Sequence, residues 1–306
     1  MMQPIKSQKM LTGKIRKVLI LFKIFLQEIF CKCQVIKMSV TFNYNGEIIK
    51  ANWGDDINYW FFRELTKTPL INYDWSLYTQ KLNRPYIMGI GSILTLFPIK
   101  NSIIWGSGII SEKAPIKGRP QEVRAVRGPL TRQRLLDQGI NCPEVYGDPA
   151  LLLPFFYKPF IKKKYSLGII PHYTDQHNPL WKNLYKEIDV LVIDIRCYEH
   201  WLDFIDQICQ CETIASSSLH GLIVSEAYGI PNLWIKLKGS KLTDDFKYHD
   251  FFLSIGRDRE AFEIDHPITK NELWTAVQKW KKGNINLAPL LASCPFKLKR
   301  NIEITR

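Results

Sequence analysis

The chain has 306 residues, of which 46% are hydrophobic and 23% are charged, enough for one large or two medium-sized domains with their own cores. This composition excludes a disordered, a collagen-like and a disulfide-stapled protein. The formal net charge of +13 points to a polyanion or an anionic membrane surface as partner, but residues 1–37 carry +7 of it, so the other 269 residues carry only +6. We therefore do not expect a nucleic acid as partner.

Residues 1–37 form a basic and apolar prefix. Its apolar run, Val18–Cys31, contains Lys23 and Glu28 and is shorter than the roughly 20 residues that a membrane span needs. No small-residue cleavage site follows it, so it does not resemble a secretory signal. Two interpretations remain: a peripheral amphipathic segment on the inner face of the membrane, or an artefactual extension upstream of a start at Met38. We favour the extension, because strand and helix patterning begins after Met38.

The seven cysteines form no CxxC pair, and no histidine cluster follows the two C-x-C pairs. Reduced thiols in a cytoplasmic protein explain them better than disulfides or a metal site.

The first domain is expected over residues 38–155, where short β-branched or aromatic runs alternate with runs of helical period. This alternation predicts a parallel sheet flanked by helices. One helix is expected to begin near Asp55, and a second has Pro129 in its first turn and Gly139 just past its end. The predicted strands are 86–90, 103–105, 123–126 and 144–146.

The second domain is expected over residues 165–265, after a linker at 154–164 that contains two prolines and three consecutive lysines. Residues 266–306 then form a C-terminal helix and tail, and the helix opens with a capping box of Thr269 and Glu272. In the second domain, strands are predicted at 167–170, 190–193, 213–215 and 232–235, with helices at 180–188, 198–210 and 219–228. The predicted fold is α/β, with two doubly wound, Rossmann-like domains facing each other across a cleft that holds the site.

Candidate site residues in the second domain concentrate where a strand passes into a helix near His220. The free N–H groups and the dipole of that helix favour a bound anion. Such an anion would raise the pKa of His220 and keep it protonated, as a general acid requires. An ordinary serine cap with a hydrogen-bonded histidine remains the alternative. The predicted donor-binding residues here are Ser216, Ser217, Ser218, Gly221 and Glu226.

Arginines and glycines at strand ends are the candidates in the first domain. A guanidinium at a strand end can bind a carboxylate or phosphate in a bidentate way. For Arg127 we favour this functional role over a solvated position, whereas for Arg124 the two interpretations are evenly balanced. Asp148 and Asp55 are candidate bases, and Asp148 could instead be a partner of an arginine or a turn former. The residues predicted to line the cleft or contact an acceptor are Asn52, Gly54, Gly91, Ser92, Gly108 and His172. No P-loop, dinucleotide or metal-ligand motif is present.

Seven collinear stretches, spanning about 180 residues, resemble the polysaccharide pyruvyl transferase family. They are NWGDDIN (52–58), GIGSIL (89–94), WGSGI (105–109), VRAVRGPLTRQRL (123–135), YGDPALLLP (146–154), IIPHY (169–173) and SSSLHGLIVSEAYGIP (216–231). The resemblance implies two Rossmann-like domains arranged as in GT-B glycosyltransferases, with His220 as general acid and Arg127 holding the donor. The chain departs from several members at Ser218, where they have a second arginine. Donor binding would then depend on backbone N–H groups, the serines or another cation such as Arg124.

The resemblance further implies transfer of pyruvate from phosphoenolpyruvate to a sugar, with a cyclic ketal as the usual product. The acceptor would be a polysaccharide of the cell surface or its lipid-linked precursor. No cofactor or metal is expected beyond phosphoenolpyruvate itself. Two alternatives stay open: a nucleotide-sugar glycosyltransferase of the same architecture, and a non-catalytic protein that binds polyanions or a membrane surface through its basic charge.

Overall fold

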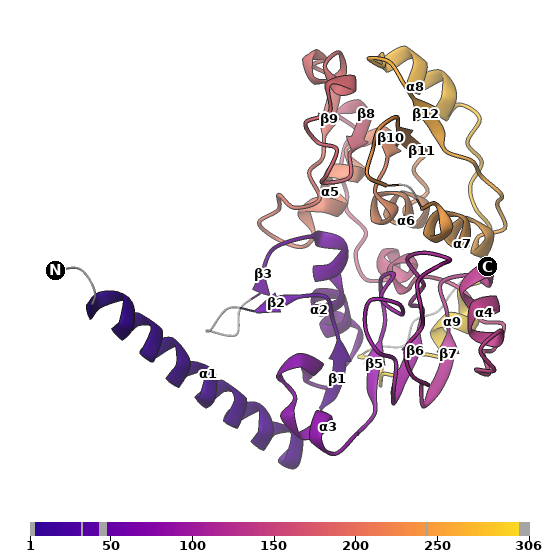
Figure 1. Ribbon diagram of the computed structural model, residues 1–306. Helices are drawn as coiled ribbons and strands as arrows, with labels where there is room; N and C mark the ends of the chain where they lie inside the picture. The colour runs from indigo at the N-terminus through magenta and orange to yellow at the C-terminus, as the bar shows by residue number, and fades with distance from the viewer. Residues whose placement is uncertain (1–3, 32, 43–47, 243, 300–306) are drawn as a thin grey trace.

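The computed structural model describes residues 4–31, 33–42, 48–242 and 244–299 (Figure 1). Its first half contains a five-stranded sheet in which every neighbouring pair is parallel, for example with Ile36 beside Ile87. The strands lie in the order β4-β1-β5-β6-β7. Their bounds are β1 Gln34–Lys37, β4 Leu70–Asn72, β5 Tyr86–Met88, β6 Ser102–Trp105 and β7 Glu122–Ala125. A separate antiparallel pair joins β2 (Thr41–Phe42) to β3 (Ile48–Ile49).

The second half repeats this architecture. Its parallel sheet has the order β12-β11-β10-β8-β9, with Ile214 beside Gly168. The bounds are β8 Tyr165–Ile170, β9 Val190–Val192, β10 Cys211–Ser216, β11 Asn232–Leu237 and β12 Phe262–Ile264. Counted along the chain within each sheet, both orders read 2-1-3-4-5, which is a doubly wound order. The predicted α/β class with two parallel sheets is confirmed.

Helices flank both sheets (Figure 1). The bounds are α1 Pro4–Phe30, α2 Trp53–Leu65, α3 Leu77–Lys81, α4 Pro129–Leu136, α5 Asp203–Cys209, α6 Leu219–Ala227, α7 Phe246–Ser254, α8 Lys270–Val277 and α9 Ala288–Ala292. The side chain of Asn52 caps α2 by accepting a hydrogen bond from Gly54 N. Ile57, Phe61 and Leu65 are buried along one face of α2, as expected of an amphipathic helix.

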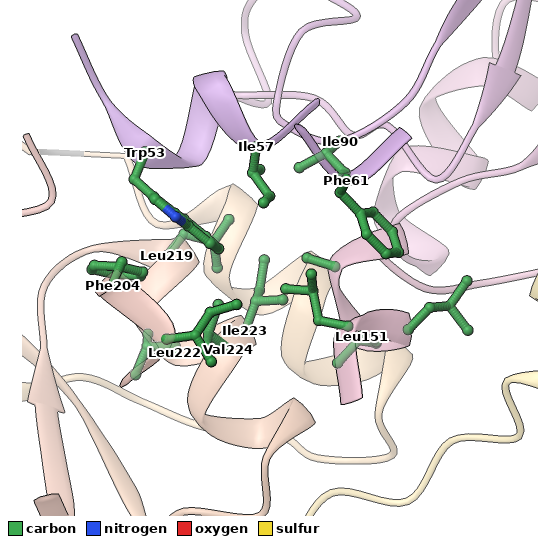
Figure 2. Close-up of a cluster of buried hydrophobic side chains, with 14 of the residues drawn as sticks. Trp53, Ile57, Phe61, Ile90, Leu151, Phe204, Leu219, Leu222, Ile223 and Val224 are labelled. Carbon is green, nitrogen blue, oxygen red and sulfur yellow. The ribbon is translucent and has the colours of Figure 1, made fainter. Parts of the chain in front are cut away.

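An apolar cluster joins the two halves. Figure 2 shows Trp53 and Ile57 of α2 facing Leu219 and Ile223 of α6, with Phe61 of α2 above Leu151. Helix α6 carries buried residues on all its faces, because the 3₁₀ segment 149–155 and α5 also pack against it. Between α2 and α6 the halves therefore meet in a dry contact, and the cleft of a GT-B arrangement stays a prediction.

The expected boundary at residue 37 is wrong. Strand β1, at Gln34–Lys37, lies inside the first sheet between β4 and β5, with Val35 and Ile36 buried. The preceding helix α1 is also attached, since its buried Glu28 accepts a hydrogen bond from Thr79 Oγ1 at 2.8 Å. A four-residue strand directly after a basic helix is too short to show a period, and this explains the error.

Two predicted helices in the second half differ from those observed. The segment 180–188 forms two short 3₁₀ turns, Pro179–Trp181 and Leu184–Lys186, which bury Trp181 and Leu184. The helix predicted from residue 198 begins only at Asp203, whose carboxylate accepts hydrogen bonds from the backbone of the preceding turn. These bonds hold residues 199–200 in a turn before α5, so the helix begins five residues later than the apolar pattern predicted.

The C-terminal segment begins on the second half and returns to the first. The capping box of Thr269 and Glu272 at the start of α8 is confirmed. Beyond α8, Trp105 Nε1 donates to Leu290 O at 2.9 Å, and Lys299 N donates to Leu65 O at 3.0 Å. The tail therefore helps to fix the two halves relative to each other.

Candidate functional site

The candidate residues meet at the carboxyl ends of the strands in both sheets. In an order of 2-1-3-4-5, chain connections leave in opposite directions from the first strand, and ligands bind beside that point. Gly91 and Ser92 follow β5 in the first half, while His172 follows β8 and the serine turn follows β10 in the second. The start of α2 lies against the second half, since Trp53 N donates to Ile195 O at 2.9 Å.

His220 lies in the first turn of α6 and packs against the start of α2. A Cβ at Gly54 would be 2.0 Å from His220 Nδ1, so the ring occupies space that only a glycine leaves open. Its Nε2 is buried without a hydrogen-bond partner. Burial, followed by the positive charges of Lys247 and Arg127, lowers the pKa of His220 to about 3. The raised pKa expected from the sequence was conditional on a bound anion, and without that anion the shift has the opposite sign.

An aspartate and a lysine lie in the same electrostatic environment as His220. Burial and the neighbouring Asp56 raise the pKa of Asp55 to about 7, against the opposing charge of Lys247. Burial and Arg127 lower the pKa of Lys247 to about 8. The carboxyl, imidazole and amine groups are all shifted toward their neutral forms. The pKa values of Asp55 and Lys247 lie near neutral pH, whereas His220 needs added negative charge to be protonated there.

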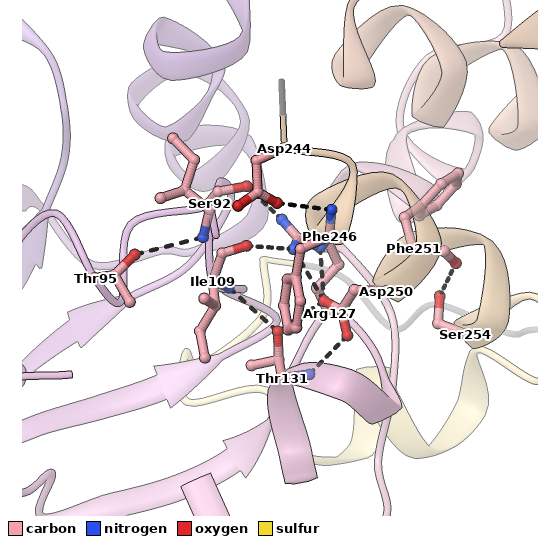
Figure 3. A network of polar contacts seen from close by, with 11 residues as sticks. Ser92, Thr95, Ile109, Arg127, Thr131, Asp244, Phe246, Asp250, Phe251 and Ser254 are labelled. Atoms are coloured by element: carbon pink, nitrogen blue, oxygen red, sulfur yellow. Dashed lines mark hydrogen bonds and ion pairs between the residues drawn. The ribbon is translucent and has the colours of Figure 1, made fainter. Parts of the chain in front are cut away.

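Arg127 is enclosed by hydrogen-bond partners (Figure 3). Its Nε donates to Asp250 Oδ2 at 2.9 Å, its Nη2 donates to Ile109 O at 2.8 Å, and its Nη1 donates to Ser92 Oγ. Both side chains of the Arg127–Asp250 ion pair are 0% exposed. A Cβ at Gly108 would be 2.3 Å from Arg127 Cζ, so this glycine makes room for the guanidinium. A solvated Arg127 is therefore excluded.

Asp250 connects α7 of the second half to α4 of the first. In addition to Arg127, it binds Thr131 through the backbone N–H at 2.8 Å and through Oγ1 at 2.7 Å. Both carboxylate oxygens are thus occupied, as a buried charge requires. The pair fixes the guanidinium in position and ties the two halves together.

Asp148 is both a capping residue and a buried acid. Its Oδ1 accepts from Ala150 N at 2.9 Å and caps the 3₁₀ segment 149–155, while its Oδ2 is buried without a partner. Burial raises the pKa of Asp148 to about 6, although the Ala150 N–H and Arg127 oppose the shift. The turn-forming role is present in the structure, and the free oxygen leaves a role in proton transfer open to test.

The serine turn is held by its own hydroxyls. Ser216 Oγ accepts from Ser218 N at 3.0 Å, and Ser217 Oγ accepts from His172 N at 2.8 Å. Ser218 is the N-cap of α6 but makes no side-chain cap bond, and Gly221 lies against Ser216 Oγ, where a Cβ would be only 2.5 Å away. The first N–H groups of α6 have no partner within the helix and form the positive end of its dipole beside His220.

A family model for polysaccharide pyruvyl transferase matches residues 28–238. The chain belongs to this family. It is similar to protein L143 of Acanthamoeba polyphaga mimivirus, at 33% identity over 62% of this chain and 67% of that protein. It is also similar to the succinoglycan biosynthesis protein ExoV of Rhizobium meliloti, at 29% identity over 70% of this chain and 64% of ExoV. The chain thus spans about two thirds of the length of these relatives, and the resemblance stated from the motifs is confirmed.

The remaining predicted residues of this family member shape the same region. Asn52 caps α2, and the carbonyl of Gly91, at a φ of +111°, accepts from Gly108 N at 3.0 Å. His172 lies at the end of β8, where burial and the charge of Lys247 lower its pKa to about 4. Within the described part of the chain, no group of three or more His, Cys, Asp or Glu side chains is placed to hold a metal ion.

Two of the predicted donor-binding residues are engaged elsewhere. Glu226 is about one and two-thirds turns from His220 along α6 and so lies on a different face, where it accepts from Asn232 Nδ2 at 3.0 Å and Trp280 Nε1 at 2.9 Å. Arg124 alternates to the other face of β7 and pairs with Glu122 at 2.9 Å. The structure does not bring either residue together with His220, so Arg124 does not replace the missing arginine.

Lys247 is the site residue that the sequence analysis missed. It lies in the first turn of α7, and its charge acts on His220, His172 and Asp55. In the sequence it stands between acidic and aromatic residues and looks like an ordinary solvated lysine of a helix. Only the packing of α7 against the first half shows that this is the cation beside the histidine.

Proposed function

We propose that this chain transfers a pyruvyl group from phosphoenolpyruvate to hydroxyls of a sugar in a polysaccharide or its lipid-linked precursor, releasing inorganic phosphate in the cytoplasm. Membership of the polysaccharide pyruvyl transferase family supports the reaction class, and the similarity to ExoV supports a role in polysaccharide synthesis. The observation that carries the proposal is the buried Nε2 of His220, which lacks a partner, belongs to the first turn of α6 and feels the charge of the half-buried Lys247.

The donor supplies the charge that the site needs. A phosphate and a carboxylate suit the first turn of α6. Ser218 replaces an arginine of several family members, and Lys247, whose charge acts on His220, supplies a positive charge in this chain. Arg127, fixed by Asp250, adds further positive potential without having to leave its partners. Negative charge beside His220 opposes the effect of both cations and raises the pKa of the imidazole. Binding of the donor therefore leads to protonation of the histidine that acts as the general acid.

The reaction then follows from proton transfer. Protonated His220 delivers its proton to the methylene carbon of phosphoenolpyruvate while a sugar hydroxyl adds to C2 and loses its proton to a base. Asp55, with a pKa of about 7, is one candidate base, and Asp148, with a pKa of about 6, is another. The C2–O bond to phosphate breaks, a second sugar hydroxyl adds to C2, and its proton leaves with the phosphate. The products are a pyruvate ketal and inorganic phosphate, which balance the two substrates.

The deciding experiment incubates the purified protein with phosphoenolpyruvate and a panel of sugar and lipid-linked acceptors. We expect phosphate release that depends on the acceptor, together with an acceptor mass increased by one pyruvate ketal. Release of a nucleoside diphosphate from a nucleotide sugar, with no consumption of phosphoenolpyruvate, would instead establish the glycosyltransferase alternative and overturn the proposal.

A further inference from the structure

Helix α1 contacts the body along its C-terminal half, from Lys17, whose Nζ lies 6.0 Å from the centroid of the Trp75 ring, to Glu28. There, buried Glu28 accepts hydrogen bonds from Ser76 and Thr79, and Phe25 packs edge-on against Tyr78 with ring centroids 5.8 Å apart. Figure 1 shows the N-terminal part of α1 standing clear of the sheets. One face of the last turns is therefore fixed against α3, and the helix axis has a set direction.

The opposite face of α1 is a continuous exposed apolar stripe. Its residues recur at spacings of three and four, which places them on one side of a helix. Several are far more exposed than large apolar side chains usually are, with Phe22 at 59% and Phe30 at 79%. The outer stripe consists of Ile15, Val18, Leu19, Phe22, Leu26, Ile29 and Phe30.

The charge of α1 is almost entirely basic. Its 27 residues contain six lysines and arginines, and its single acid, Glu28, is used in the attachment to α3. Lys23 is exposed in the same turns as Phe22 and Leu26. Among the described residues, no helix has the length and apolar character needed to cross a bilayer. An exposed apolar stripe with an exposed lysine beside it, on a helix of basic composition, is the pattern of a helix lying in a membrane interface.

We propose that the outer stripe of α1 docks this protein on a membrane surface that carries anionic lipids. The apolar side chains enter the boundary between headgroups and acyl chains, and the lysines and arginines contact the anionic headgroups. A second copy of the chain is a weaker fit, because packing two basic helices against each other would bring like charges together. The inference concerns a surface and does not depend on the reaction proposed above.

The test measures co-sedimentation of the full chain with vesicles. We expect binding to phosphatidylcholine vesicles that contain phosphatidylglycerol, weaker binding to phosphatidylcholine alone, and loss of binding as salt screens the headgroups. The double substitution Phe22→Glu with Leu26→Glu should lower the binding constant by about tenfold or more. The matched control is Phe160→Glu, since Phe160 is a fully exposed aromatic residue outside α1, and its binding should equal that of the unmodified protein.

The outcomes separate the possible occupants of the stripe. Failure of the unmodified protein to bind either vesicle, or equal binding by the double variant, would overturn the proposal. A dimer in sedimentation velocity that the double variant converts to monomer, without vesicle binding, would assign the stripe to a second copy instead. Phosphate release with a soluble acceptor should be unchanged in the double variant, so failure of the reaction and failure of the docking are read independently.

Discussion

At the junction of the halves, the buried guanidinium of Arg127 and the buried Nε2 of His220 differ in whether they have hydrogen-bond partners. Arg127 has a protein partner at each of its guanidinium nitrogens and is sealed by Asp250. His220 is only half-buried between α6 and α2, yet its Nε2 is buried and has no partner. A satisfied buried charge fixes geometry, whereas an unsatisfied buried nitrogen costs stability and is retained where it serves chemistry. The comparison predicts that Arg127 and Asp250 matter first for folding and His220 first for turnover.

Replacing His220 tests the chemical side of this comparison and should have the largest effect. We expect His220→Gln to lower the rate of phosphate release by about 10²–10⁴-fold, the usual contribution of a general acid, with the melting temperature close to that of the unmodified protein. The rate is measured under saturating phosphoenolpyruvate, and thermal unfolding is followed in parallel. A large fall in melting temperature with full turnover per folded molecule would show that the imidazole is a structural group.

Breaking the Arg127–Asp250 pair tests the structural side. Asp250→Ala removes the partner and leaves a buried guanidinium uncompensated, so we expect the free energy of unfolding to fall by about 3–5 kcal/mol. Urea titration measures it. The double variant Arg127→Met with Asp250→Leu removes both charges and should recover most of the lost stability. If Asp250→Ala is as stable as the unmodified protein, the pair is not the tie between the halves that its burial indicates.

The substitution Gly54→Ala tests the chemical and structural sides together, because the methyl group that it adds lies against the imidazole of His220. A Cβ at this position would be 2.0 Å from His220 Nδ1, so the ring has to move. We expect phosphate release to fall by about a hundredfold through misplacement of the acid. In a double-mutant cycle, Gly54→Ala should then cost little further activity when His220→Gln is already present. Additive losses would mean that Gly54 acts independently of the histidine.

The sequence was sufficient to predict the repeated elements and the motif-bearing turns. The class, the parallel sheets and the capping box of Thr269 and Glu272 could be predicted because periodicity and capping are local properties. Strand β1 could not be predicted, because four residues are too few to show a hydrophobic period and because the strand is buried by neighbours that lie far along the chain. The boundary predicted at residue 37 was wrong for the same reason.

The residues of the candidate site also fall into those that local motifs predict and those that only long-range packing reveals. His220, Arg127 and the serine turn follow strands and carry recognisable motifs. The ion pair of Arg127 with Asp250 joins residues 123 positions apart. The charge of Lys247, which acts on the pKa of His220, also comes from a distant segment of the chain. Glu226 was predicted from its proximity in sequence, but the helical rotation between positions 220 and 226 separates them. Residue types therefore predicted which groups could act, and only the packing decided which of them share one environment.

The smallest effect expected is a pH dependence of stability that comes from the same unpartnered imidazole. Burial holds the pKa of His220 at about 3 in the folded chain, against about 6.5 when unfolded. As the pH falls below 6.5, the unfolded chain binds a proton that the folded chain refuses, so stability is lost between pH 6.5 and 3. The raised pKa of Asp55, about 7, acts in the opposite direction, because the destabilisation of the folded state by this carboxyl grows as the pH rises from the unfolded pKa of aspartate toward 7.

Comparing the unmodified protein with His220→Gln removes the contribution of Asp55, which both proteins share, and leaves that of the histidine. Between pH 6.5 and 4.5, the free energy of unfolding of the unmodified protein should fall by about 2 kcal/mol more than that of the variant. Parallel curves would mean that folding does not lower the pKa of His220, and the donor would then not be needed to restore its affinity for a proton.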